Sequence, residues 1–297
     1  LVALCVLQLV AEGKLQLDEP VASIWPDFIQ ADKSSITLRQ LLCHRAGMSA
    51  FHQHIANEQI FTWDVMVNAI AAESPWWEPN TAQGYSPFMF GWILGELVKR
   101  ASGCASFNEY FQQYVAQPLS VNCHFGVPDL LLDSVADTGP LKADPRGVTN
   151  RAFSNPISLM TATNSREWRQ AQIPAAGAHA DARALATIYG ALANTQQNLL
   201  AESALPLCWQ EQTFEQDCTL GLPLRFSHGF MLSQPDRADC RYGRGARAFG
   251  HPGAGGCIGF ADPDFELGFG YVTHRMGNRI LIDERAVRLI DAAYAIL

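Results

Sequence analysis

The 297-residue sequence has no run of lysine and arginine, and its acidic residues outnumber its basic ones. Lys and Arg total 21 against 29 Asp and Glu, which gives a formal net charge of -8. Because nucleic-acid phosphates are bound by basic faces, the sequence predicts no nucleic-acid partner. A small neutral or cationic substrate is compatible with this charge.

The eight cysteines form no CxxC pair, and no metal-binding spacing is visible. His52 and His54 are the one close histidine pair, and without a third ligand at a recognisable spacing they indicate a surface loop. Disulfide frameworks and zinc sites need dense, short cysteine spacings. We therefore expect no metal site, and we expect most of the cysteines to be reduced core residues.

The apolar stretch at residues 1–11 is too short to cross a membrane, which takes about 20 apolar residues. It also lacks the basic leader of a signal peptide. The stretch is predicted to be a helix buried on all sides, ended at Gly13 with Lys14 near its carboxyl end. Since the sequence starts with Leu inside this run, we expect it to be a fragment. Hydrophobic residues at 48% and charged residues at 17% indicate neither a disordered nor a membrane-spanning chain.

Further helices are predicted by apolar residues at helical spacing and by capping residues. They cover residues 38–46, 62–73, 88–101, 107–116, 182–193 and 283–297, with caps at Thr37, Thr62, Ser106 and Asp181. Residues 226–232 are predicted to be one strand. Residues 121–176 contain five prolines and predict a long irregular surface segment, which is typical of a functional loop or lid.

Residues 249–276 carry the most informative pattern. His251 and Pro252 precede a glycine-rich turn, and apolar residues then alternate on both sides of a second turn at residues 262–264. This pattern predicts a β-hairpin. Glycines there let backbone N–H groups approach a ligand, as an oxyanion site requires, although an ordinary tight turn would show the same pattern.

Tyr85 stands directly before a predicted helix, with Ser86 as N-cap and Pro87 at the first helical position. Unpaired N–H groups at a helix amino end favour an anion. We therefore expect the Tyr85 phenolate to form more easily than in water. A tyrosine that only packs at the helix entrance would fit the same pattern.

Cys257 offers a rival nucleophile, because residues 255–259 have the spacing of a GxSxG elbow with Cys in the place of Ser. Such an elbow passes from a strand into a helix. Here the residues after Cys257 alternate like a strand. Cys257 is therefore predicted to be a buried strand residue.

Three stretches taken together resemble the serine β-lactamase and penicillin-binding-protein superfamily, most closely its carboxylesterase branch. They are the first helix with its end at residues 12–15, the tripeptide at 84–86 and the tripeptide at 251–253. Residues 36–47, 77–79, 91–98 and 249–260 add supporting matches, so the resemblance covers nearly the whole chain. It implies a β-lactamase/transpeptidase-like α/β fold of the α+β type, with an antiparallel sheet flanked by helices and a helical lobe.

The resemblance also implies one catalytic domain over residues 1–297, with residues 1–200 mainly helical and residues 223–297 forming the sheet and a C-terminal helix. In this family a serine and a lysine form an SxxK motif that begins the first helix. The chain contains no SxxK. We expect that motif, and the N-terminal strands of the family sheet, to precede Leu1.

Site residues carry over only where the motifs match. Tyr85 is expected to be catalytic as a proton shuttle, and the Ala254 backbone N–H to supply half of the oxyanion hole. His251 and Gly253 match the ends of the third motif and are expected to bind substrate. Pro87 stands at the substrate-binding position that is Asn in lactamases. The resemblance implies no cofactor.

Three departures favour an ester substrate over a β-lactam. The first is Pro87, which lacks the side-chain amide of the lactamase Asn. Lactamases have Lys-Thr-Gly in the third motif, whose ammonium and hydroxyl hold the β-lactam carboxylate, and this chain has His251 and Pro252 there. A small-molecule ester needs no such anchor, so a carboxylesterase that works through an acyl-enzyme is expected. The alternatives are a β-lactamase or D-Ala-D-Ala peptidase, and an inactive homologue that serves as a binding or scaffold protein.

Overall fold

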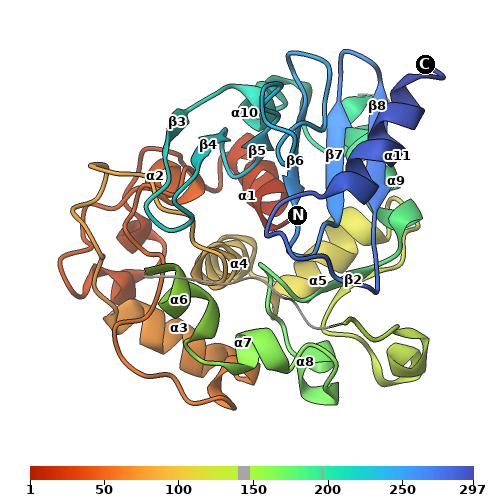
Figure 1. The fold of residues 1–297 in the computed structure, drawn as a ribbon. Helices are drawn as coiled ribbons and strands as arrows, with labels where there is room; N and C mark the ends of the chain where they lie inside the picture. Colours follow the sequence, from red (N-terminus) through yellow and green to blue (C-terminus); the bar gives the residue numbers. More distant parts are fainter. Residues whose placement is uncertain (140–147, 195–196) are drawn as a thin grey trace.

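The computed structural model describes residues 1–139, 148–194 and 197–297 (Figure 1). A six-stranded antiparallel sheet has its strands in chain order. They are β3 (Thr213–Gln216), β4 (Pro223–Phe226), β5 (Met231–Leu232), β6 (Phe249–Pro252), β7 (Ile258–Asp262) and β8 (Leu267–Tyr271). A second sheet pairs β1 (Cys123–Phe125) with β2 (Ala178–Ala180).

Eleven α-helices lie in the described residues. They are α1 (Val2–Ala11), α2 (Leu38–Leu42), α3 (Trp63–Ala72), α4 (Met89–Ser102), α5 (Phe107–Phe111), α6 (Val148–Ser154), α7 (Ser158–Thr161), α8 (Arg166–Gln170), α9 (Ala182–Ala193), α10 (Pro206–Trp209) and α11 (Glu284–Tyr294). In Figure 1, α3, α4, α6 and α7 gather below the sheet as a helical lobe. The predicted architecture of an antiparallel sheet with flanking helices and a helical lobe is confirmed.

Helix α1 is buried along almost its whole length, as predicted. Its one buried polar side chain, Gln8, donates a hydrogen bond to the Leu199 carbonyl at 2.8 Å. The helix ends at Ala11, and Gly13 follows with a φ of 72°. Glycine adopts this left-handed conformation without the steric cost that other residues meet.

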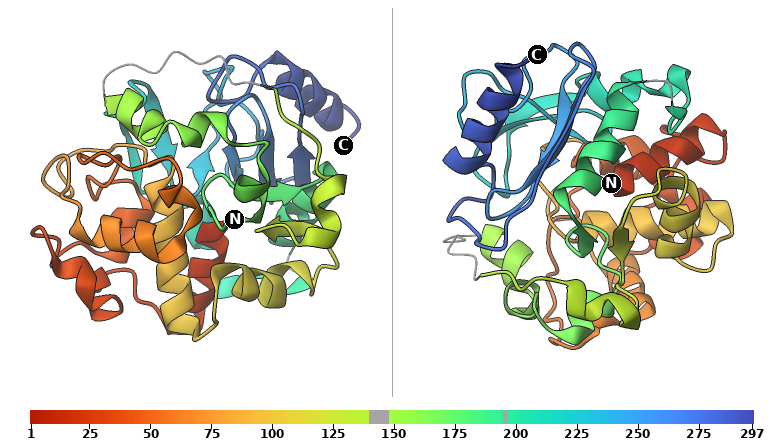
Figure 2. Two further views of the ribbon diagram at one scale, coloured as in Figure 1. Left: turned by 90° about the horizontal axis from the view of Figure 1, so that it is seen from below. Right: turned by 90° about the vertical axis from the view of Figure 1, so that its right-hand side faces the viewer.

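Helices α9 and α11 cover opposite faces of strands β7 and β8 (Figure 2, right). Side chains alternate between the two faces of a strand, so Phe260 and Phe269 face α11, whereas Gly268 faces α9. A Cβ at Gly268 would lie 2.1 Å from the backbone nitrogen of Gly190 in α9. Glycine in β8 therefore permits the close approach of this helix to the sheet.

Most predicted helices and caps are confirmed. Thr37 begins α2 with a capping box to Gln40, and Asp181 accepts a hydrogen bond from the Ala184 N–H at 2.7 Å at the start of α9. Helix α2 nevertheless ends at Leu42, short of the predicted residue 46. All eight cysteines are free, and five of them are buried.

The predicted start of α4 is wrong. The helix begins at Met89 with Phe88 as N-cap, so Pro87 lies before the first turn and not in it. Ser86 still accepts a hydrogen bond from the Phe90 N–H at 3.1 Å. Its hydroxyl also donates to the Met48 carbonyl at 2.6 Å, which holds the preceding segment in place outside the helix.

Two further predictions need correction. Residues 226–232 contain two strands, because the chain reverses at residues 227–229. Gly229 has a φ of 86° there, and the Ser227 N–H donates to the Phe230 carbonyl at 2.9 Å.

The described part of residues 121–176 is not irregular throughout, since it contains β1, α6, α7 and α8. Residues 140–147 of that predicted segment lie outside the described residues.

Candidate active site

The structure brings Tyr85 and His251 together. Tyr85 lies on the segment that leads into α4, and His251 lies on β6. Their rings stack with centroids 5.7 Å apart and planes inclined by 28°. Residues 249–276 were predicted to form a hairpin and instead contain three antiparallel strands, β6, β7 and β8, so Tyr85 of the helical lobe faces one end of the sheet.

His44 forms the inner wall of this site, although its sequence motif did not mark it as a site residue. The His44 ring lies 5.0 Å from the Tyr85 ring and 4.6 Å from that of Phe226, measured between centroids. Its Nδ1 accepts a hydrogen bond from the Ser86 N–H at 3.2 Å, and its carbonyl accepts one from the Gly84 N–H at 2.9 Å. His44 thus fixes the backbone on both sides of Tyr85.

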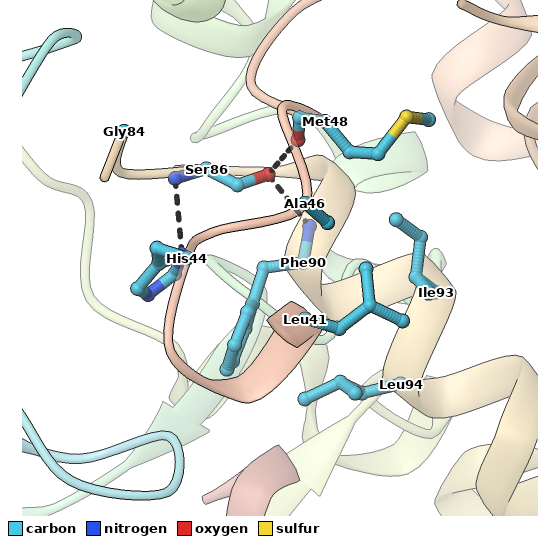
Figure 3. A pocket seen from close by; sticks show the side chains of 9 residues that line it. All are labelled: Leu41, His44, Ala46, Met48, Gly84, Ser86, Phe90, Ile93 and Leu94. Carbon is cyan, nitrogen blue, oxygen red and sulfur yellow. Dashed lines mark hydrogen bonds between the residues drawn. The ribbon is translucent and has the colours of Figure 1, made fainter. Parts of the chain in front are cut away.

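A small, mostly apolar cavity lies behind this segment (Figure 3). Figure 3 shows the Ser86 hydroxyl turned toward Met48 and the His44 ring lying below the Ser86 backbone. Pro87 is buried in the same segment. The Tyr85 ring is in contact with the third motif through His251, and a substrate-binding role for Pro87 stays a prediction.

The prediction of an easily formed Tyr85 phenolate is wrong. Burial raises the pKa of Tyr85, and the nearby Asp217 carboxylate raises it further. An anion is costly in a low-dielectric site beside another negative charge. The helix also begins four residues after Tyr85, at Met89, so the positive end of its dipole is displaced from the phenol.

Both histidines of the site are neutral at pH 7. Burial lowers the pKa of His44 to about 3, with a further contribution from His251. Burial lowers the pKa of His251 to about 4, although the hydrogen bond to the Pro252 carbonyl opposes this effect. Because the Pro252 carbonyl can only accept, His251 Nδ1 donates to it at 2.7 Å, and Nε2 keeps a free lone pair.

The turn between β6 and β7 contains a backbone N–H group, that of Ala254, which is suited to binding an oxyanion. The Gly253 N–H donates to the Cys257 carbonyl at 2.7 Å, and the Gly255 N–H donates to the Arg279 carbonyl at 2.9 Å. The Ala254 N–H between them meets no acceptor in the residues that the structure describes. A half-buried, unpaired N–H in a fixed turn is a donor suited to an oxyanion.

The segment after β8 supports this turn through hydrogen bonds that no sequence motif predicted. The Gly255 carbonyl accepts hydrogen bonds from the Gly277 N–H and from Arg285 Nη2, each at 2.8 Å. Asp283 in turn holds the Arg285 guanidinium, with 2.6 Å between Oδ2 and Nη2. The position of the Ala254 N–H therefore depends on contacts close to the start of α11.

Cys257 does not form a nucleophile elbow. It follows the β6–β7 turn and precedes β7, so no helix begins behind it. Burial raises the pKa of its thiol, which disfavours the reactive thiolate. The prediction of a buried strand residue is only approximate, since Cys257 is half-buried and stands one residue before the strand.

Asp217 is a second residue near the site that sequence reasoning missed. Its Oδ2 accepts a hydrogen bond from the Tyr85 N–H at 2.7 Å. No motif marks this aspartate, and only the fold brings the β3–β4 loop to residue 85.

Metal and membrane features are absent from the part of the chain that is described. Exposed His52 stacks on Trp76 with centroids 4.0 Å apart and contacts the Glu73 carboxylate at 2.6 Å. No group of three potential metal ligands lies together among the described residues. None of the described helices has the length and apolar character needed to cross a membrane.

The sequence model of the family described as Beta-lactamase matches residues 1–292. The chain belongs to the β-lactamase family. It is 27% identical to the esterase/beta-lactamase LipL of Mycobacterium tuberculosis over 302 aligned residues, which cover 94% of this chain and 68% of LipL. The predicted superfamily is therefore confirmed.

Solved structures of this family superpose on nearly the entire chain. A penicillin-binding-protein homologue from Caulobacter crescentus has a TM-score of 0.91 and 35% identity, covering 100% of this chain and 81% of its own. A family VIII carboxylesterase has a TM-score of 0.92 and 34% identity, covering 100% of this chain and 80% of its own. The family is hydrolytic, and this chain has esterases among its relatives.

Proposed function

We propose that this β-lactamase-family protein is a serine carboxylesterase that cleaves small-molecule esters through an acyl-enzyme. One observation carries the choice of substrate. Where lactamases present an ammonium and a hydroxyl, this chain presents the neutral imidazole of His251 and the ring of Pro252. A neutral ester needs no cationic partner in the site. The carboxylate of a β-lactam would have no ammonium to bind here, as it has in lactamases.

Tyr85, Ala254 and His251 have distinct roles in this proposal. The Tyr85 phenol carries a proton between the attacking serine hydroxyl and the leaving alkoxide. The Ala254 N–H stabilises the oxyanion that forms on the ester carbonyl. The free Nε2 of His251 accepts a hydrogen bond at the mouth of the site. Water then releases the acid from the serine.

The nucleophile of this proposal is the serine of an SxxK motif, which the 297 residues do not contain. We place that serine and its lysine in a segment before Leu1. Support comes from α1, whose amino end lies close to His251 of β6 (Figure 1). The 297 residues alone are predicted to form no acyl-enzyme.

The test uses the protein produced from its source gene, including the codons before Leu1. Its kcat/KM is measured with p-nitrophenyl butyrate and with a chromogenic cephalosporin. The loss of a hydrogen bond to a charged group lowers kcat/KM by roughly 10- to 100-fold. The kcat/KM for the ester is therefore expected to exceed that for the cephalosporin by at least this factor. Preference for the cephalosporin would instead support a β-lactamase.

Two variants complete the test. Replacing the upstream serine with alanine is expected to abolish hydrolysis, whereas Cys257→Ala is the matched control and is expected to keep it. Absence of an upstream SxxK, or full activity of the Ser→Ala variant, would contradict the proposal. Hydrolysis of neither substrate would favour an inactive homologue.

A further inference from the structure

Asp217 is a fully buried carboxylate in the loop between β3 and β4. Its Oδ1 accepts hydrogen bonds from the backbone N–H groups of Thr219 and Leu220, both at 2.9 Å. Its Oδ2 accepts one from the Tyr85 N–H at 2.7 Å and a longer one, 3.4 Å, from the Gln83 side chain. Both oxygens are therefore used, and all of these donors are neutral.

No lysine, arginine or histidine forms a salt bridge with Asp217 among the described residues. Burial raises the pKa of this carboxyl, and the hydrogen bonds from N–H groups oppose that effect. Burying a carboxylate without a cation costs stability, and here only dipoles compensate. An asparagine at this position would have only one side-chain oxygen, which could accept the hydrogen bonds of Thr219 and Leu220. The second oxygen of the carboxylate is the one that accepts from Tyr85 and Gln83.

Further hydrogen bonds connect the β3–β4 loop, which carries Asp217, to the segment before α4. The Cys218 N–H donates to the Gln83 carbonyl at 2.9 Å, and the Gln83 side chain donates to the Leu224 carbonyl at 3.2 Å. The Asp217 N–H also donates to the Leu222 carbonyl at 2.9 Å, which fixes the loop itself. Tyr85 belongs to the helical lobe, yet its backbone is attached to the same sheet that carries His251.

We propose that Asp217 is a positioning residue for Tyr85: its carboxylate holds the Tyr85 peptide so that the phenol stays against His251, an inference that rests on the proposed esterase function. The carboxylate touches neither the substrate nor the reacting atoms. It acts through the backbone of Tyr85, which sets the position of the phenol. Small displacements of a catalytic group have large effects on rate. The raised pKa of Tyr85, to which Asp217 contributes, is consistent with this placement.

The first test compares Asp217→Asn with Asp262→Asn in the complete protein. Asp262 is a matched control, since it is also fully buried and its Oδ2 accepts the N–H groups of Arg244 at 3.0 Å and Gly245 at 2.8 Å, beside α11. Both variants are expected to lower the melting temperature. Only Asp217→Asn is expected to lower kcat, by roughly 10- to 100-fold, with KM unchanged within about twofold.

A double variant separates positioning from a general loss of structure. If Asp217 acts through the Tyr85 hydroxyl, Asp217→Asn has little further effect on kcat when Tyr85 is already Phe. Additive losses in the double variant, or equal loss of kcat in Asp262→Asn, would overturn the proposal.

A spectroscopic test does not depend on ester hydrolysis. In protein labelled with ¹³C-tyrosine, the Tyr85 ring resonance is assigned by its loss in Tyr85→Phe. Asp217→Asn is expected to shift this resonance and to lower the pH at which Tyr85 ionises, whereas Asp262→Asn leaves both unchanged. An unmoved Tyr85 resonance would overturn the positioning role. A wild-type protein that cleaves no ester but shows the shift would overturn only the proposed function.

Discussion

The ring of Tyr85 stacks on the ring of His251 with 5.7 Å between centroids, and this contact joins the helical lobe to strand β6. The two residues belong to motifs far apart in the sequence. The buried His44 ring also packs against Tyr85, with 5.0 Å between centroids and planes inclined by 62°, so the phenol contacts two imidazoles that are both neutral at pH 7. A neutral phenol with fixed neighbours is suited to passing a proton rather than to serving as an anion.

Removing the Tyr85 hydroxyl is predicted to affect the chemical step. In the complete protein, Tyr85→Phe is expected to lower kcat by about 10²- to 10⁴-fold with little change in KM, since a proton shuttle acts in the transition state. Tyr110→Phe is the control, because Tyr110 is buried in α5 and its hydroxyl has no hydrogen-bond partner among the described residues. Equal kcat values for Tyr85→Phe and wild type would exclude the shuttle.

His44 is predicted to make the protein sensitive to acid. The pKa of His44 is about 3 when folded, against a reference of about 6.5 when unfolded, so the unfolded state binds a proton first as the pH falls. Stability is therefore lost below pH 6.5, by about 1.4 kcal/mol per pH unit and roughly 2 kcal/mol by pH 5.

Urea unfolding of wild type and His44→Asn at pH 7 and pH 5 tests this prediction. Asparagine tolerates the φ of 55° at this position and offers an oxygen to the Ser86 N–H, but it does not titrate. The variant is expected to lose less stability than wild type between the two pH values. An identical pH dependence would mean that His44 is not buried in its neutral form.

Gly268 is predicted to set the distance between β8 and α9. Gly268→Ala places a Cβ 2.1 Å from the Gly190 nitrogen and is expected to cost about 1 to 3 kcal/mol in the free energy of unfolding. Gly190→Ala is the control on the facing helix, where the nearest atom to the new Cβ is 3.9 Å away and alanine favours the helix. Similar stabilities of the two variants by urea unfolding would contradict this packing.

Cys257 is predicted to be dispensable for catalysis. Its thiol pKa is raised by burial and no helix follows it, so Cys257→Ala is expected to keep kcat within about threefold of wild type. The measurement is hydrolysis of p-nitrophenyl butyrate. A loss comparable to that of the upstream Ser→Ala variant would revive the elbow interpretation.

Local patterns were sufficient where a local hydrogen bond decides the structure. Asp181 and Thr37 cap their helices with their own side chains, so neighbouring residues alone predicted them. The hydroxyl of Ser86 instead bonds the distant Met48 carbonyl, and the predicted helix start there was wrong. The prediction for residues 226–232 was also wrong, because the chain reverses at Gly229 within an apolar pattern that is typical of a single strand.

The site could be predicted from the order of its motifs but not from its electrostatics. The resemblance assigned both Tyr85 and His251 to the site, and their rings stack, whereas their roles stay predictions. The ionisation of Tyr85 was predicted from a helix end alone, whereas burial and the Asp217 charge control it. Asp217 lies in the β3–β4 loop without a motif, so only the folded structure reveals its contact with Tyr85.

The most direct test of the esterase proposal is to locate the covalent intermediate. The complete protein is incubated with a p-nitrophenyl ester, quenched in acid during turnover, and examined by intact-mass and peptide mass spectrometry. The proposal predicts one acyl group per chain on the serine of an SxxK motif before Leu1, accumulating less in Tyr85→Phe. An acyl group on Cys257, or ester hydrolysis without any acylated serine, would contradict it.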